Sequence, residues 1–91
     1  MIVRIMGEGQ YRLPDGRLTR LNKLDDAVVA AVAGGHERRF RTAYEKMLTF
    51  VRQNGTPLAA TELSASDVVL PFASLTLEEG KAVFVGRGLI P

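Results

Sequence analysis

Few side chains in this sequence could carry out catalysis. The chain has no cysteine, which excludes thiol chemistry, zinc ribbons and iron–sulfur ligation, and its one histidine, His36, excludes sites built on several imidazoles. His36 follows two glycines at the start of a predicted helix, where a solvated or capping role is expected. The adjacent carboxylates of Asp25-Asp26 and Glu78-Glu79 diverge by about 100° around a helix and are not placed to share a proton or a metal ion. We therefore expect no enzymatic activity, no cofactor and no metal site.

One acidic residue interrupts an apolar helical stripe. Leu18, Leu21, Val28 and Val32 recur at spacings of three and four residues, and Asp25 falls among them. An unpaired buried carboxylate would be costly. Asp25 is therefore expected either to be a buried structural residue, with arginine or backbone N–H partners, or to lie at the edge of the helix in water.

Arginine makes up nine of the twelve basic residues, which favours forked contacts with carboxylates or phosphates. The first candidate partner-binding surface is one face of a predicted N-terminal hairpin, where arginines lie beside apolar residues, as is typical of protein interfaces. It consists of Ile2, Arg4, Met6, Gln10 and Arg12. The alternative is that the C-terminal segment covers this face. The second candidate surface, for which a solvated helix face is the commoner explanation, consists of Arg38, Arg41 and Arg52.

Period-2 alternation predicts a β-hairpin at the start of the chain. Two short runs, residues 2–6 and 10–13, flank a three-residue link that contains two glycines, a common hairpin signature. In the simplest register Val3 and Ile5 share a face with Tyr11 and Leu13, and the first candidate surface lies on the opposite face.

The middle of the chain predicts two amphipathic helices. The first runs from Leu18 to Ala33 and ends at Gly34-Gly35, and the second runs from Glu37 to Gln53 and ends at Asn54-Gly55. A short glycine link between two such helices indicates an antiparallel helical hairpin.

The last third of the chain is less regular. Ser66 and Asp67 are expected to cap a single helical turn that ends at Leu70-Pro71. A capping box formed by Thr76 and Glu79 predicts a short third helix. Residues 83–85 suit a helix or a strand, and Gly86-Arg87-Gly88 ends that element. The predicted fold is α+β, with an N-terminal β-hairpin packed on an antiparallel helical hairpin plus a short third helix.

Length and composition place these elements in one domain, residues 1–91, with 46% hydrophobic and 24% charged residues. The net charge of +2 is small for a nucleic-acid binder of this size. No apolar run approaches the ~20 residues that span a bilayer, and the first residues lack the layout of a signal peptide. We expect a cytoplasmic protein.

Several stretches, in chain order, resemble the PspA-associated family, which is named after the phage-shock protein PspA, a membrane-remodelling coiled-coil protein. They are MIVRIMGEGQYR at 1–12, LNKLDDAV at 21–28, NGTPL at 54–58, SDVVLP at 66–71, LEE at 77–79 and GLIP at 88–91. Gly80 and Val83-Phe84-Val85 depart from the family pattern and weaken the third helix expected there.

The resemblance implies a non-enzymatic accessory or adaptor protein that binds a PspA-like coiled-coil protein in the envelope stress response. Membrane contact would then be indirect, at the inner face and through that partner, and no catalytic residues are carried over. The residues themselves leave two alternatives. One is a small DNA-binding regulator of the winged-helix type, because helices beside a β-hairpin superficially suggest that fold. The other is direct lipid contact through the arginines of the second helix.

Overall fold

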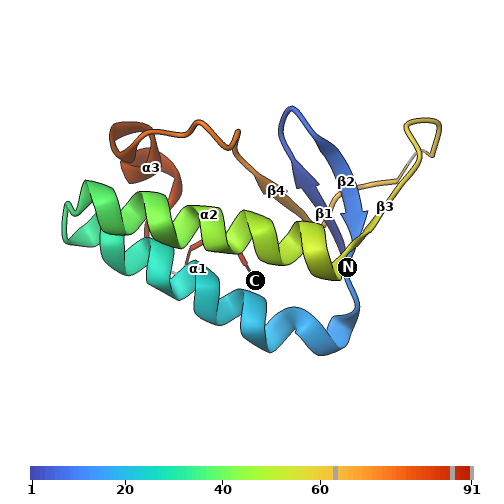
Figure 1. The fold of residues 1–91 in the computed structure, drawn as a ribbon, viewed down its shortest axis with the longest axis horizontal. Coiled ribbons are helices and arrows are strands. Elements are labelled where there is room, and N and C mark those ends of the chain that lie inside the picture. The colour runs from blue at the N-terminus through green and yellow to red at the C-terminus, as the bar shows by residue number, and fades with distance from the viewer. Residues whose placement is uncertain (63, 87, 91) are drawn as a thin grey trace.

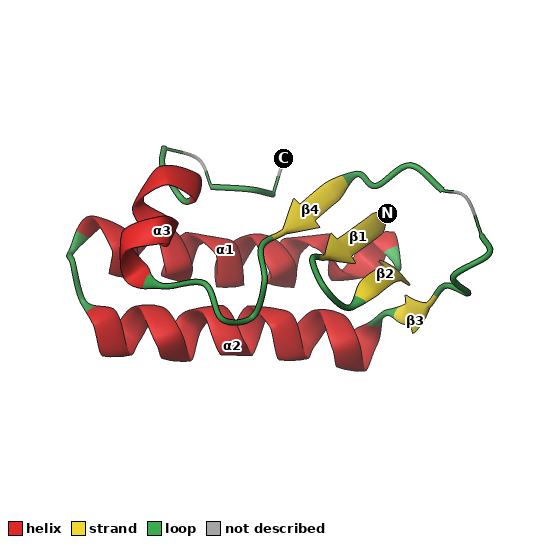
Figure 2. Cartoon of the chain, turned by 90° about the horizontal axis from the view of Figure 1, so that it is seen from above, coloured by secondary structure: helices red, strands yellow, loops and turns green. Residues whose placement is uncertain are grey.

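The computed structural model describes residues 1–62, 64–86 and 88–90. The helices α1 and α2 lie antiparallel in one layer, and a small sheet and α3 lie side by side on the same face of that layer (Figures 1 and 2). In chain order the elements are β1 (Ile2–Ile5), β2 (Gly9–Arg12), the 3-10 turn η1 (Asp15–Arg17), α1 (Leu18–Ala33), α2 (Glu37–Asn54), β3 (Thr56–Pro57), β4 (Val68–Leu70) and α3 (Leu77–Val83). The predicted α+β fold is confirmed.

The sheet has four strands in the order β3-β2-β1-β4. β1 pairs antiparallel with β2 and places Val3 opposite Tyr11, which is the register that the alternation predicts. Val3 and Ile5 are fully buried against the helices, while Arg4 between them is exposed on the other face. The pleat therefore separates a core face from an outer face.

The expected helical turn at Ser66 and Asp67 is wrong, because residues 68–70 form the strand β4, parallel to β1. The Asp67 carboxylate accepts a hydrogen bond from the Ile2 N–H at 2.6 Å, and the Asp67 N–H donates to the Ile2 carbonyl at 2.8 Å. Both bonds attach Asp67 to the start of β1 and align Val68 with Val3. A residue that resembles a helix cap locally is here the anchor of a long-range strand pair.

Helices α1 and α2 follow the predicted bounds, and α2 extends one residue further, to Asn54. Their inner sides share a core with the sheet, in which an aromatic cluster joins α2 to the segment after α3. Phe40 stacks on Tyr44 with ring centroids 5.8 Å apart, and Phe84 meets both rings edge-on. The Tyr44 hydroxyl donates to the Pro71 carbonyl at 2.5 Å, which ties α2 to the end of β4. No helix of the described residues is both long and apolar enough to cross a bilayer.

Helix α3 begins at the predicted capping box. The Thr76 hydroxyl accepts from the Glu79 N–H, and the Glu79 carboxylate accepts from the Thr76 N–H at 2.9 Å. The helix ends at Val83, so of residues 83–85 only Val83 is helical, and Phe84 and Val85 form neither a strand nor a further helical turn. Phe84 leaves the helix because its ring is buried in the aromatic cluster. Arg87, in the predicted glycine-flanked stop, lies outside the described residues.

Candidate protein-interaction surfaces

The hairpin face lies on the outer side of the sheet, and part of it is covered. Arg4, Met6 and Arg12 are exposed, but Ile2 and Gln10 are buried, so the expectation that all five residues are available to a partner is wrong for these two. The physical reason is topological. β3 and β4 follow one another in the chain but lie at opposite edges of the sheet, so the segment between them must pass around it (Figure 2).

Hydrogen bonds from Gln10 fix part of that segment against the sheet. The Gln10 amide donates to the Ser64 carbonyl at 2.8 Å and to the Ser66 hydroxyl at 2.9 Å. These bonds satisfy a polar side chain that would otherwise be costly to bury. Gln10 therefore supports the fold, and the covering segment lies before β4 rather than at the C-terminus, where the sequence suggested it.

Three apolar side chains remain exposed beside Arg4. Met6, Val69 and Phe72 are 40%, 47% and 51% exposed, and Val69 lies next to Arg4 in the sheet register. The Phe72 ring lies against Gly7, where a Cβ atom would be 2.9 Å from the ring. We call Arg4, Met6, Val69 and Phe72 the sheet patch. Sequence reasoning missed Val69 and Phe72 because it did not recognise β4, although the VVLPF run was the signal that could have found them.

The second candidate surface does not form one free surface. The Arg41 guanidinium donates to the carbonyls of Ala73 and Leu75, and therefore holds the segment that leads into α3. Arg52 forms a two-point contact with Glu8 in the hairpin turn, with an Nε–Oε1 distance of 2.8 Å. This hydrogen bond lowers the pKa of Glu8 and raises the pKa of Arg52. The Arg38 side chain is exposed and forms no hydrogen bond or ion pair with another described residue.

Asp25 is 0% exposed and acts as an anchor for the C-terminal segment. Its carboxylate accepts from the N–H groups of Leu89 at 3.2 Å and Ile90 at 3.0 Å. These are backbone partners, one of the two kinds that the sequence suggested. Burial raises the pKa of Asp25, and the two backbone hydrogen bonds partly oppose that shift. Gly88 has a φ of +80°, and a Cβ atom there would lie 2.3 Å from the carboxylate, so the approach requires glycine.

The described residues show no cluster of metal-ligating side chains. Within residues 1–62, 64–86 and 88–90, no group of three or more His, Asp or Glu side chains could hold a metal ion. His36 is exposed at the N-terminus of α2, and it forms no ion pair with a carboxylate of the described residues. The arrangement can offer exposed cations and apolar side chains, including those on the uncovered part of the outer sheet face, to a macromolecular partner.

The sequence model of one protein family matches the chain over residues 1–91, and that family is described as PspA-Associated protein. No curated protein and no solved structure matches the chain.

Proposed function

The chain belongs to the PspA-associated protein family, and from this we propose that it is a non-enzymatic adaptor that binds a PspA-like coiled-coil protein in the envelope stress response. The match over the whole chain is the observation that carries the proposal. The residue content supports the non-enzymatic part, since a single exposed histidine and no cysteine leave little for nucleophilic or acid–base chemistry. Membrane association would be indirect, through the partner.

The sheet patch is the surface that we propose for this contact. Three half-exposed apolar side chains, of which Val69 is the register partner of Arg4, combine with this arginine the residue types that are enriched at protein interfaces. A coiled coil offers rows of Asp and Glu side chains beside apolar ones, and an arginine fork binds a carboxylate at two points. Arg12 adds a second exposed cation on the same face, next to β3.

A DNA-binding regulator is the weaker proposal. In a winged helix the hairpin protrudes beside a recognition helix, whereas here both hairpin strands are internal members of a four-stranded sheet. Helix α3 begins with Glu78 and Glu79, which would repel phosphates. Both features favour a protein partner over a nucleic acid.

Reversing the outer-face charges tests the proposed contact. The double variant Arg4→Glu/Arg12→Glu should fold, because both side chains are exposed, and should weaken binding to a PspA homologue by about tenfold at low salt. Added salt should reduce the difference, because screening weakens the repulsion. Isothermal titration calorimetry at two salt concentrations measures both effects.

The matched control is Arg17→Glu/Lys23→Glu, which makes the same charge change at exposed positions off the sheet. It should bind as the wild type does. Equal affinity of the wild type and the Arg4/Arg12 variant would remove the outer sheet face from the contact. Failure of the wild-type chain to bind the PspA homologue at all would overturn the proposed function itself.

A further inference from the structure

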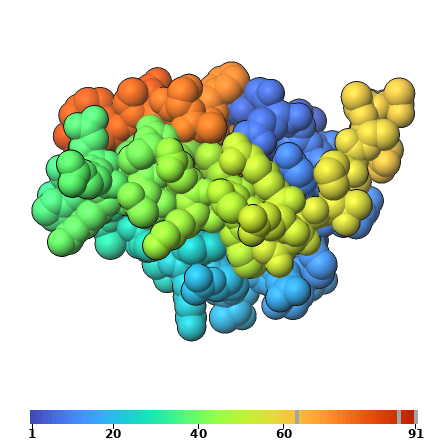
Figure 3. Space-filling model, in the orientation of Figure 1, coloured from blue at the N-terminus to red at the C-terminus, as the bar shows by residue number. Residues whose placement is uncertain are grey.

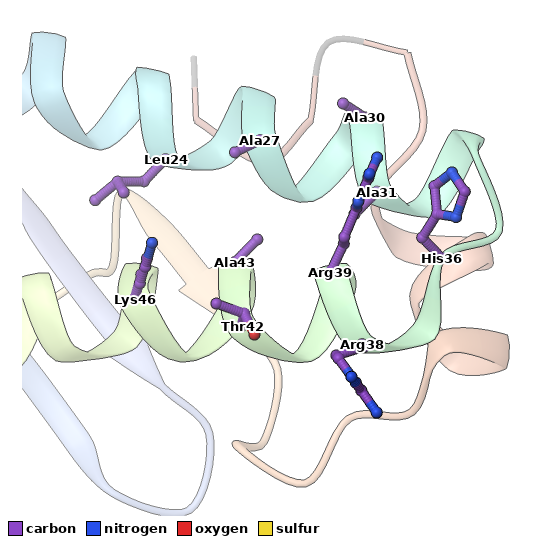
Figure 4. Close-up of a pocket in the computed structure, with 10 residues that line it drawn as sticks. All are labelled: Leu24, Ala27, Ala30, Ala31, His36, Arg38, Arg39, Thr42, Ala43 and Lys46. Carbon is purple, nitrogen blue, oxygen red and sulfur yellow. The ribbon is translucent and has the colours of Figure 1, made fainter.

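A groove runs between α1 and α2 on the side of the helix pair that the sheet and α3 leave uncovered. Its main cavity has a volume of about 530 Å³. A second cavity of about 430 Å³ continues it toward the C-terminus of α2, since both cavities share Leu24, Thr42 and Lys46 in their walls. Figure 4 shows that α1 contributes alanines to the groove and α2 contributes the basic side chains.

The floor of the groove is apolar because the residues that face each other are small. Ala27 and Ala30 of α1, which are exposed, line the groove together with Ala43 of α2, and the buried Leu24 and Ala31 complete its apolar lining. Short side chains at these positions leave a trough between the two helices that neither helix fills. Such an unfilled apolar strip on a helix pair can receive the side chains of a third helix.

The rim of the groove is basic. Arg39 and Lys46 point from α2 toward the trough, while Arg38 at the same end points away from it (Figure 4). Among the described residues, none forms an ion pair with Arg39 or Lys46. The walls of the two cavities contain four lysine or arginine residues, and Glu45 is the one carboxylate among them. The groove therefore presents uncompensated positive charge beside an apolar floor.

We propose that this groove binds an acidic amphipathic α-helix of a partner protein. Small and aliphatic side chains of such a helix would occupy the trough, and carboxylates on its flanks would meet Arg39 and Lys46. From Arg38 to Gln53 the groove follows about 16 residues of α2, or roughly 24 Å, which suits a helix of similar length. The inference does not depend on the proposed function, because the sheet patch lies on the other layer of the molecule.

The shape of the groove favours a helix over a membrane surface. Peripheral insertion into lipid requires protruding Trp, Phe or Leu side chains on the apolar face. Here the apolar lining consists of short alanine side chains, the buried Leu24 and the half-buried Phe50, which could not enter a bilayer while the longer arginine and lysine side chains surround them. A convex acyl surface would leave this trough empty, whereas the side chains of a helix would fill it.

The test uses an 18-residue helical peptide with an alanine and leucine seam flanked by glutamates, together with a matched peptide in which every glutamate is lysine. Fluorescence anisotropy of the labelled peptides gives the affinity, and amide chemical shifts of the isotope-labelled protein locate the contact. We expect the acidic peptide to bind, with the largest shifts at Ala27, Ala30 and Ala43, and the lysine peptide to bind at least tenfold more weakly.

Two variants of the intact chain test the groove, one for its basic rim and one for its apolar trough. Arg39→Glu/Lys46→Glu reverses the rim, and Ala27→Gln/Ala30→Gln fills the trough with neutral side chains that favour helix. Each variant should bind the acidic peptide at least tenfold more weakly than the wild type does. The matched controls are Ala33→Gln, at an exposed position of α1 outside the groove, and Arg4→Glu/Arg12→Glu on the sheet. Both controls should bind the peptide as the wild type does.

Equal binding of the two peptides, or of the wild type and both groove variants, would overturn the inference. A second result would also overturn the inference: the acidic peptide does not bind, whereas vesicles of anionic phospholipid bind the wild type but not the Arg39→Glu/Lys46→Glu variant. The basic rim would then bind a membrane surface. Since PspA is not used in this experiment, these results are separate from the test of the proposed function.

Discussion

Asp25 joins two parts of the chain that are far apart in sequence. It lies on α1 and accepts hydrogen bonds from the N–H groups of Leu89 and Ile90, while Gly88 provides the space for the close approach. A carboxylate has enough lone pairs to accept both bonds at once, which an amide or hydroxyl oxygen would do less well. The residue therefore stabilises the C-terminal segment against α1, and its burial raises its pKa.

The substitution Asp25→Ala should lower the free energy of unfolding by about 1–3 kcal/mol, because it leaves two N–H groups without this acceptor. Urea denaturation followed by far-UV circular dichroism measures the change. The amide protons of Leu89 and Ile90 should also exchange faster with solvent in the variant. A change below about 0.5 kcal/mol would show that water replaces the carboxylate at little cost.

The cost of Asp25→Ala should also depend on pH. Because the pKa of Asp25 is raised above its ordinary value of 3.8, the folded state binds the proton more tightly than the unfolded state. The contribution of Asp25 to stability is then largest below pH 3.8 and falls as the pH rises through the raised pKa. Denaturation of both proteins between pH 3.5 and 7 should therefore show a smaller cost of the substitution at pH 7. A cost that grows with pH would mean that the pKa is lowered.

At the scale of elements, α3 is positioned by the absence of a side chain at Gly80. Glycine inside a helix costs about 1 kcal/mol relative to alanine, yet α3 forms here with a complete capping box. A Cβ atom on Gly80 would lie 3.0 Å and 3.1 Å from two ring carbons of Phe40. That ring stacks on Tyr44 and meets Phe84 edge-on, so it has little freedom to move away.

Gly80→Ala should therefore destabilise the protein in spite of the better helix former. Overpacking costs typically about 1–3 kcal/mol and helix propensity returns about 1 kcal/mol, so we expect a net loss of about 1 kcal/mol in urea denaturation. The matched control is Gly16→Ala, since Gly16 has open space around it and should tolerate the change or gain a few tenths of a kcal/mol. If Gly80→Ala were as stable as the control, the Phe40 ring would be able to move away from the added methyl group, and the expected overpacking would be wrong.

The elements that were predictable are those fixed by local pattern. The hairpin register, both long helices and the capping box at Thr76 each depend on residues fewer than about 20 positions apart. β4 was not predictable in this way, because three residues make a strand only by pairing with β1, 65 residues earlier at the Asp67–Ile2 bond. The burial of Ile2 and Gln10 and the exposure of Val69 and Phe72 follow from that pairing. Of the sheet patch, the sequence therefore predicted the hairpin residues Arg4 and Met6 but not Val69 and Phe72.

The arginines of the second candidate surface also show that sequence spacing does not predict long-range contacts. Sequence spacing placed Arg38, Arg41 and Arg52 on one flank of α2, and α2 is indeed a continuous helix. Whether each guanidinium is free depends on segments that the spacing does not contain, namely the carbonyls before α3 and the Glu8 side chain. The groove was missed for a related reason, since alanines give little signal until two helices are placed side by side.

At the scale of the whole molecule, the two proposed surfaces belong to different layers. The outer face of the sheet carries Arg4, Met6 and Val69, and the groove opens between α1 and α2 on the side away from the sheet. The space-filling view shows the hairpin and the segment around α3 along one side of the molecule, with the helix pair forming the other side (Figure 3). An adaptor requires two surfaces that can be occupied at once, and this two-layer arrangement provides them.

The chain should therefore bind a PspA homologue and the acidic helical peptide at the same time. Saturating the groove with peptide should change the affinity for the PspA homologue less than twofold, because no element needs to move for both to bind. Sedimentation velocity with labelled peptide should show the label in the larger complex, and Arg39→Glu/Lys46→Glu should remove the label without removing the complex. Mutual exclusion of the two ligands would contradict this arrangement and would place the coiled-coil contact in the groove between α1 and α2.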